Sequence, residues 1–159
     1  MSQHVYILRG IPGAGKSTWA KKEHDARVFS ADDFFTDSAR KYIFVPDGIQ
    51  RAHDDCLHRF LKDVQRVWGA YGRVSDTLVV DNTNCTLLEV VPYLRIALAC
   101  DAQVTVVDFE GYHVTAAARN VHGVPPTVVK RMADTLAAER TDKLPPYLLE
   151  RIHRIVVQT

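Results

Sequence analysis

The sequence predicts an α/β protein, in which a five-stranded parallel sheet carries helices on both faces. Two observations support this fold class. Short apolar segments of strand-like composition alternate with segments whose apolar residues recur at helical spacing, and a glycine-rich loop joins the first strand to a helix. Alternation of this kind requires crossover connections, which make the strands parallel and place the helices on the faces of the sheet.

The expected strands span residues 4–9, 26–30, 77–81, 103–109 and 152–158. The expected helices span residues 18–24, 49–68, 87–100, 114–120 and 127–140. The helix over 49–68 has the clearest periodicity, since its apolar residues recur at steps of three and four, and Gly69 and Gly72 end it. Along its polar side Arg59, Lys62 and Arg66 form a basic stripe, for which a solvated face is favoured over a phosphate-binding one.

The composition is typical of an ordinary globular protein. The 159 residues suit a single domain over residues 1–159, and the apolar content of 47% is enough to bury a core. A net charge of +1 gives no overall field that would draw the protein onto nucleic acid, although it leaves room for a local basic patch.

Cysteine usage and hydropathy bear on the compartment. The three cysteines are odd in number and form no C-x-x-C pair, which favours buried thiols in a reduced, cytoplasmic compartment. We find no signal peptide and no apolar run near 18 residues, so we expect neither export by that route nor a membrane span.

Residues 10–17 satisfy the G-x-x-x-x-G-K-[ST] pattern of the phosphate-binding P-loop, in the strand–loop–helix context that its mechanism requires. The glycines let consecutive N–H groups point at a polyphosphate, Lys16 reaches the β- and γ-phosphates, and the Ser17 hydroxyl ligates Mg²⁺. We therefore predict a bound nucleoside triphosphate; the alternative is a glycine-rich turn that matches by chance. The predicted binding residues are Gly10, Ile11, Pro12, Gly13, Ala14, Gly15, Lys16 and Ser17.

Two adjacent carboxylates, Asp32 and Asp33, follow the second strand, where open α/β sheets place their ligands. A phosphoryl-transfer enzyme needs a carboxylate near the acceptor hydroxyl to orient it and accept its proton. We assign this role to Asp32 first and to Asp33 second. The alternative is that Ser30 or Asp32 caps a short helix.

The segment over 36–48 mixes positive charge with aromatic rings, contributed by Arg40, Lys41, Tyr42 and Phe44. This mixture suits a nucleic acid strand as acceptor, with its phosphates on the cations and its bases on the rings. The alternative is a loop whose aromatic rings fold onto the core.

The strand over 77–81 ends in Asp81, which is the Walker B arrangement of a buried strand that presents a carboxylate to the Mg²⁺ shell. Asn82 and Asn84 follow it, and they are available either for acceptor contacts or for local turn bonding. The two late helices are separated by Gly123 and a pair of prolines, which predicts a lid over approximately residues 112–128. Arg119 in this lid would stabilise charge on the transferred phosphoryl group, unless it is a surface arginine.

Four blocks of the chain resemble the small P-loop kinases of the polynucleotide kinase and NEDD4-binding protein 2-like group, which carry an AAA_33-type ATPase domain. The blocks are residues 10–18, 30–35, 80–84 and 119–125. The resemblance implies a single P-loop kinase domain that uses ATP and Mg²⁺ to phosphorylate a hydroxyl. It places Lys16, Ser17 and Thr18 at the nucleotide, matches Asp32 to the general base and matches the block of Arg119 to the lid arginine.

The chain departs from the phage-type polynucleotide kinase on the acceptor side. Phe35 stands where that enzyme has an arginine after the acidic pair, and Asn82 stands where it has an aspartate. An aromatic acceptor side would fit a hydroxymethylated pyrimidine base in DNA as well as a 5′-OH end. The predicted acceptor contacts are Asp33, Phe34, Tyr42, Asn82 and Asn84.

Three functions follow from these residues. The first is a kinase that acts on a nucleic acid hydroxyl, and the second is a small-molecule kinase for a nucleoside, sugar or antibiotic. The third is a nucleotide-binding switch without phosphotransfer, against which the acidic pair argues, because a sensor needs no acceptor base. We favour the first.

Overall fold

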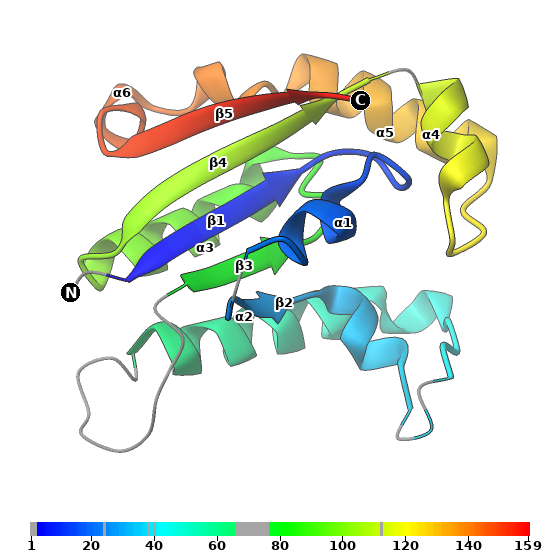
Figure 1. The fold of residues 1–159 in the computed structure, drawn as a ribbon, viewed down its shortest axis with the longest axis horizontal. Coiled ribbons are helices and arrows are strands. Elements are labelled where there is room, and N and C mark those ends of the chain that lie inside the picture. The colour runs from blue at the N-terminus through cyan, green and yellow to red at the C-terminus, as the bar shows by residue number, and fades with distance from the viewer. Residues whose placement is uncertain (1–2, 24, 38, 40, 66–76, 112) are drawn as a thin grey trace.

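The computed structural model describes residues 3–23, 25–37, 39, 41–65, 77–111 and 113–159 (Figure 1). Its centre is a sheet of five strands that all run parallel, in the order β2-β3-β1-β4-β5. The strands are β1 (His4–Arg9), β2 (Arg27–Phe29), β3 (Thr77–Asp81), β4 (Gln103–Glu110) and β5 (Ile152–Gln158). The five-stranded parallel sheet predicted from the sequence is confirmed.

The helices fall close to their expected positions. They are α1 (Lys16–Ala20), α2 (Ile49–Gln65), α3 (Leu87–Ala99), α4 (His113–Arg119), α5 (Pro126–Ala138) and α6 (Pro146–Leu149). Among the described residues they are joined by the 3-10 turns η1 (Ala31–Phe35), η2 (Pro46–Gly48) and η4 (Thr141–Lys143). The predicted end of the long helix at Gly69 lies outside the described residues. No helix in the described part of the chain has both the length and the apolar character to cross a membrane.

The sheet separates two apolar clusters. Alternate strand residues point to opposite faces, so that Val5 and Ile7 of β1 join one cluster and Leu8 joins the other. The first cluster contains the buried faces of α2 and α3, whereas the second packs under α1 and continues to α4 and α5. Figure 1 shows α1 in front of the sheet and α2 and α3 behind it, which confirms helices on both faces.

The strand order brings three chemically important chain segments to one edge. Leu8 of β1 is level with Asp81 of β3, and Phe29 of β2 is level with Val80. The segments that leave the carboxyl ends of these parallel strands therefore lie together, and they are the P-loop, the acidic pair and the Walker B aspartate. This edge is where open α/β sheets bind their ligands.

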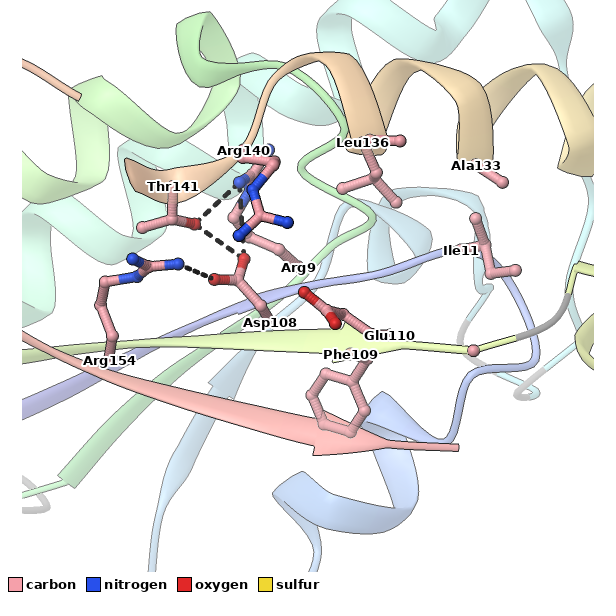
Figure 2. Close-up of a pocket in the computed structure, with 12 residues that line it drawn as sticks. Arg9, Ile11, Asp108, Phe109, Glu110, Ala133, Leu136, Arg140, Thr141 and Arg154 are labelled. Atoms are coloured by element: carbon pink, nitrogen blue, oxygen red, sulfur yellow. Dashed lines mark hydrogen bonds and ion pairs between the residues drawn. The ribbon is translucent and has the colours of Figure 1, made fainter. Parts of the chain in front are cut away.

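Arg9, the last residue of β1, ties this edge together from inside the protein. Its side chain is 1% exposed, and each of its five N–H groups has an acceptor. The acceptors are the backbone oxygens of Asn84, Cys85 and Glu139, the Thr141 hydroxyl and, at 3.4 Å, the Asp108 carboxylate. Figure 2 shows Thr141 and Arg154 on either side of Asp108, both in contact with its carboxylate.

Replacing Arg9 by Met should therefore destabilise the protein strongly. The variant leaves three carbonyls without their charged donor and removes one of the two arginines at the Asp108 carboxylate. Removing one partner of a buried charge pair costs about 3–5 kcal/mol. Urea unfolding of the wild type and of Arg9→Met measures this loss in the free energy of unfolding. Arg95→Met, at an exposed position of α3, is the matched control and should change it by less than about 0.5 kcal/mol. Equal stability of the two variants would contradict the role of Arg9.

Candidate active site

The P-loop has the backbone and the lysine contacts of a phosphate cradle. Gly13 and Gly15 have φ angles of +82° and +91°, which side-chain-bearing residues rarely adopt. Lys16 is buried, and its Nζ donates to the carbonyls of Gly10 and Ile11 at 2.8 and 3.0 Å. An ammonium group carries three protons, so the third remains for a ligand oxygen. Burial lowers the pKa of Lys16, and the nearby Asp81 carboxylate opposes this shift.

Ser17 and Asp81 form a pair of hard oxygen groups beside this lysine. Ser17 lies close enough to the Asp81 carboxylate to stabilise its charge, although the two residues come from different elements. Burial raises the pKa of Asp81, and Ser17 and Lys16 oppose the shift because both stabilise the charged carboxylate. A hydroxyl and a carboxylate are the donors that Mg²⁺ prefers, so these two residues fit the metal that the P-loop pattern implies.

The acidic pair opens the turn η1, and its two members have different surroundings. The backbone N–H of Ser30 donates to Asp33, whose carboxylate also lies 3.0 Å from Arg59, while the side chain of Ser30 caps the turn. Asp33 therefore completes a capping box, and Ser30 is the cap that the alternative interpretation foresaw. Asp32 takes no part in the box through its side chain, which is 49% exposed.

Tyr42 and His122 converge on Asp32. The Tyr42 hydroxyl donates to Oδ1 at 3.4 Å, and Nε2 of His122 lies 3.3 Å from Oδ2. Burial, with a contribution from the Asp32 charge, raises the pKa of Tyr42 to about 12. Tyr42 was predicted as an acceptor contact, whereas His122 was given no role. The only sequence signal for His122 is its place in the block that contains Arg119.

Asn82 and Asn84 are buried at the end of β3, and their side-chain amides bond within the protein. The Asn82 carbonyl oxygen accepts from the N–H of Ala31 at 2.8 Å, which ties β3 to the start of η1. The Asn84 amide donates to the carbonyl of Leu8 at 2.8 Å, which ties the same segment to β1. These contacts give both residues the local bonding role foreseen as an alternative, and their contact with an acceptor stays a prediction.

The end of α4 rests on the P-loop. A Cβ atom built on Gly13 would overlap the carbonyl of Ala116 and approach the backbone nitrogen of Asn120 to 3.1 Å. Arg119 therefore belongs to a backbone segment that touches the P-loop, and its side chain is exposed. This placement brings the predicted lid arginine to the rim of the phosphate loop.

An aromatic surface lies where the sequence predicted the acceptor contacts. Phe34 and Phe44 remain 39% and 50% exposed, and the Arg51 guanidinium lies 5.8 Å from the centre of the Phe34 ring. Phe35 is buried and packs against Tyr42 and Phe44. Arg59 donates to Asp55, Asp33 and the backbone of Ser30. Arg40 and Arg66 lie outside the described residues.

Two cavities lie beside the site, and neither is lined by the polar side chains predicted to bind phosphate and metal. One of about 290 Å³ lies between α5 and the end of β4, and Figure 2 shows Ile11 of the P-loop at one end and Thr141 and Arg154 at the other. The second, of about 430 Å³, is lined by Phe34, Ile43, Val45 and Arg51 among others. Neither is lined by Lys16, Ser17, Asp32 or Asp81.

Comparison with known proteins identifies the family. A family model described as an AAA domain, AAA_33, matches residues 5–138. The chain belongs to this family. The matched segment of the AAA domain runs from β1 into α5, so it contains the P-loop, the acidic pair, Asp81 and Arg119.

A curated relative supports the same grouping. Human NEDD4-binding protein 2 is 26% identical over 138 residues, which is 82% of this chain but 7% of that protein. This chain is therefore similar to a small part of a much longer protein. The resemblance to the polynucleotide kinase and NEDD4-binding protein 2-like group is confirmed.

Solved structures show the P-loop kinase-like fold. A chain of the Pnkp1/Rnl/Hen1 RNA repair complex matches with a TM-score of 0.66 at 16% identity, over 86% of this chain and 45% of that one. A sugar kinase from Janibacter sp. HTCC2649 matches with a TM-score of 0.55 at 17% identity, over 99% of this chain and 86% of that one. At these identities the likeness is one of fold.

The contact between α4 and the P-loop can be tested by Gly13→Ala. The added Cβ would collide with the backbone of α4, so α4 should move away and its amides at residues 116–119 should exchange with solvent about tenfold faster or more. Gly15→Ala is the matched control, because Gly15 also has a positive φ but no atom lies within 4 Å of an added Cβ. Amide hydrogen exchange by mass spectrometry measures both. Equal exchange in the two variants would show that α4 does not rest on Gly13.

Proposed function

We propose that this protein is an ATP-dependent kinase, which transfers the γ-phosphate of ATP to a hydroxyl group of a nucleic acid. The observation that carries the proposal is the meeting of three groups at one edge of the sheet. These are the P-loop with Lys16, the Ser17–Asp81 pair, and the half-exposed carboxylate of Asp32. A protein that only senses nucleotide needs the first two and has no use for the third.

In this proposal the P-loop and the pair beside it hold ATP and Mg²⁺. The loop amides and the free proton of Lys16 bind the phosphates, and Ser17 and Asp81 hold the metal, Asp81 directly or through water. When bound, Mg²⁺ would neutralise charge on the phosphate oxygens. Arg119, at the end of α4, would add positive charge where negative charge develops during transfer. Helix α4 and the loop to α5, approximately residues 112–128, act as the lid of a single domain over residues 1–159.

Asp32 acts as the general base. The acceptor oxygen attacks the γ-phosphorus, the bond from that phosphorus to the β-phosphate oxygen breaks, and the hydroxyl proton passes to the Asp32 carboxylate. The Asp33 carboxylate is committed to the capping box and to Arg59, whereas the half-exposed Asp32 carboxylate takes no part in the box. We therefore keep Asp32 as the base and place Asp33 behind it.

The aromatic surface supports a nucleic acid acceptor. Phe34 and Phe44 offer exposed rings on which bases stack, and Arg51 lies over the Phe34 ring. The structural neighbour in an RNA repair complex is in keeping with this choice. The three cysteines are free thiols, as in a protein of a reducing cytoplasm.

A small-molecule kinase is the second candidate. The sugar kinase neighbour matches 99% of this chain and 86% of its own length, which is a more complete overlap than that with the RNA repair protein. A net charge of +1 also fits a small acceptor. The salt dependence of turnover separates the candidates, because phosphate contacts weaken steeply with salt and contacts to a neutral alcohol do not.

Transfer of labelled γ-phosphate from ATP with Mg²⁺ into a panel of acceptors tests the proposal. The panel holds 5′-OH DNA, 5′-OH RNA, hydroxymethylated duplex DNA with blocked ends, and a mixture of nucleosides and sugars. We expect label in one of the three nucleic acids and a rate that falls as salt rises. Label only in the mixture would replace the acceptor by a small molecule, and label in none would contradict a kinase.

Two variants in the same assay assign the roles. Lys16→Ala should remove transfer, since the phosphates lose their point charge. Asp32→Asn should lower kcat by about 10²–10⁴-fold, the usual share of a general base, with the affinity for ATP kept within about twofold. Equal loss of ATP binding in both variants would contradict the division of roles between the P-loop and Asp32.

A further inference from the structure

The lid reaches across the site to the candidate base through one side chain. Nε2 of His122, in the loop after α4, lies 3.3 Å from Oδ2 of Asp32, in the turn after β2. At this distance an N–H group on Nε2 would face an oxygen of the carboxylate. The contact joins the two parts of the protein that a phosphoryl group would pass between.

The loop that presents His122 has a shape fixed by its own hydrogen bonds. The Asn120 amide donates to the carbonyl of Val124 at 2.7 Å, and its oxygen accepts from the N–H groups of His122 and Val124 at 3.0 and 3.3 Å. Asn120 in turn sits against Gly13 of the P-loop. The backbone of His122 is therefore tied to the phosphate loop.

The imidazole meets a second group on the acceptor side. Its ring centre lies 4.9 Å from that of Tyr42, and the Tyr42 hydroxyl donates to Oδ1 of Asp32 at 3.4 Å. Tyr42 is itself held by Phe35 and Phe44. The two oxygens of Asp32 thus have one contact each, Oδ2 with His122 of the lid and Oδ1 with Tyr42 of the segment that precedes α2.

We propose that His122 is a positioning residue, which fixes the Asp32 carboxylate for proton transfer when the lid lies over the P-loop. This inference rests on the kinase function proposed above. Each carboxylate oxygen has two lone pairs, so Asp32 can accept from His122 and Tyr42 and still receive the acceptor hydroxyl. Without His122, a side chain that is 49% exposed regains its rotational freedom, and the orientation that proton transfer needs is lost. The lid then contributes Arg119 to the transferred phosphoryl group and His122 to the general base.

A double-mutant cycle tests whether His122 acts through Asp32. We expect His122→Ala to lower kcat about tenfold in the wild-type background, with KM for ATP nearly unchanged. In the Asp32→Asn background the same change should lower kcat by less than about twofold, because residues in one network lose their effect together. An equal loss in both backgrounds, or no loss in either, would overturn the proposal.

Two further variants separate positioning from folding. His122→Gln keeps an N–H donor at the end of the side chain, so it should recover most of the rate that His122→Ala loses. His58→Ala, at an exposed position of α2, is the matched control and should leave kcat unchanged. Failure of His122→Gln to exceed His122→Ala would mean that donation to Asp32 is not what His122 contributes.

Proton NMR of the imidazole groups provides a readout that needs no activity. Asp32→Asn should shift the ring signals of His122 and leave those of His53 and His58 in place. If the wild type phosphorylates no acceptor, the kinase proposal fails, and an unshifted His122 signal then overturns the contact as well. If the wild type is active but the effects of His122→Ala and Asp32→Asn on kcat are independent, the kinase function is supported and the positioning role of His122 is contradicted.

Discussion

The guanidinium group of Arg9 is the constraint on which the geometry of the site depends. It is buried at the end of β1, directly before the P-loop, and it bonds to the segments that follow β3 and α5 and to Asp108 within β4. A charge taken out of water is stable only when all its protons are paired, so these segments have to be in place together. The phosphate loop therefore starts from a point that is fixed on three sides.

Asparagines extend the same constraint to the acceptor side. Asn84 joins the segment after β3 to β1, and Asn82 joins it to the turn that carries Asp32. The P-loop, the Walker B aspartate and the acidic pair are thus linked by buried hydrogen bonds at fixed spacing. These bonds hold the three segments at fixed positions relative to one another, and in the proposed mechanism α4 and its loop would supply the lid.

The sequence was sufficient for the sheet, the P-loop and the larger helices, because each has a local signal. Apolar runs predict the five strands, and helical periodicity predicts α2 within its described length. Three short elements of the described chain escaped prediction, η2, η4 and α6, because each is too short to show a period. Two of them, η2 and α6, begin at a proline. The sequence also left Asp32 and Asp33 both open as the base, and the capping box around Ser30 separates their surroundings.

The contacts that join the site could not be predicted in this way. Arg9 lies in a strand, and three of its acceptors are backbone carbonyls. Every residue has such a carbonyl, so the sequence does not indicate which ones accept from Arg9. His122 meets Asp32 only because the loop after α4 turns back, which depends on the hydrogen bonds of Asn120. Contacts between loops that are far apart in the sequence depend on how the whole chain packs. The pattern of residue types within one segment therefore does not predict them.

A crystal structure of the protein with Mg²⁺ and a non-hydrolysable ATP analogue tests the central claim most directly. We predict that the phosphates lie in the loop of residues 10–17, with Mg²⁺ on the Ser17 hydroxyl beside Asp81. The γ-phosphate should then face Asp32 and Arg119 across a gap that an acceptor hydroxyl can enter. A nucleotide bound elsewhere, or a γ-phosphate turned away from Asp32, would contradict the kinase mechanism.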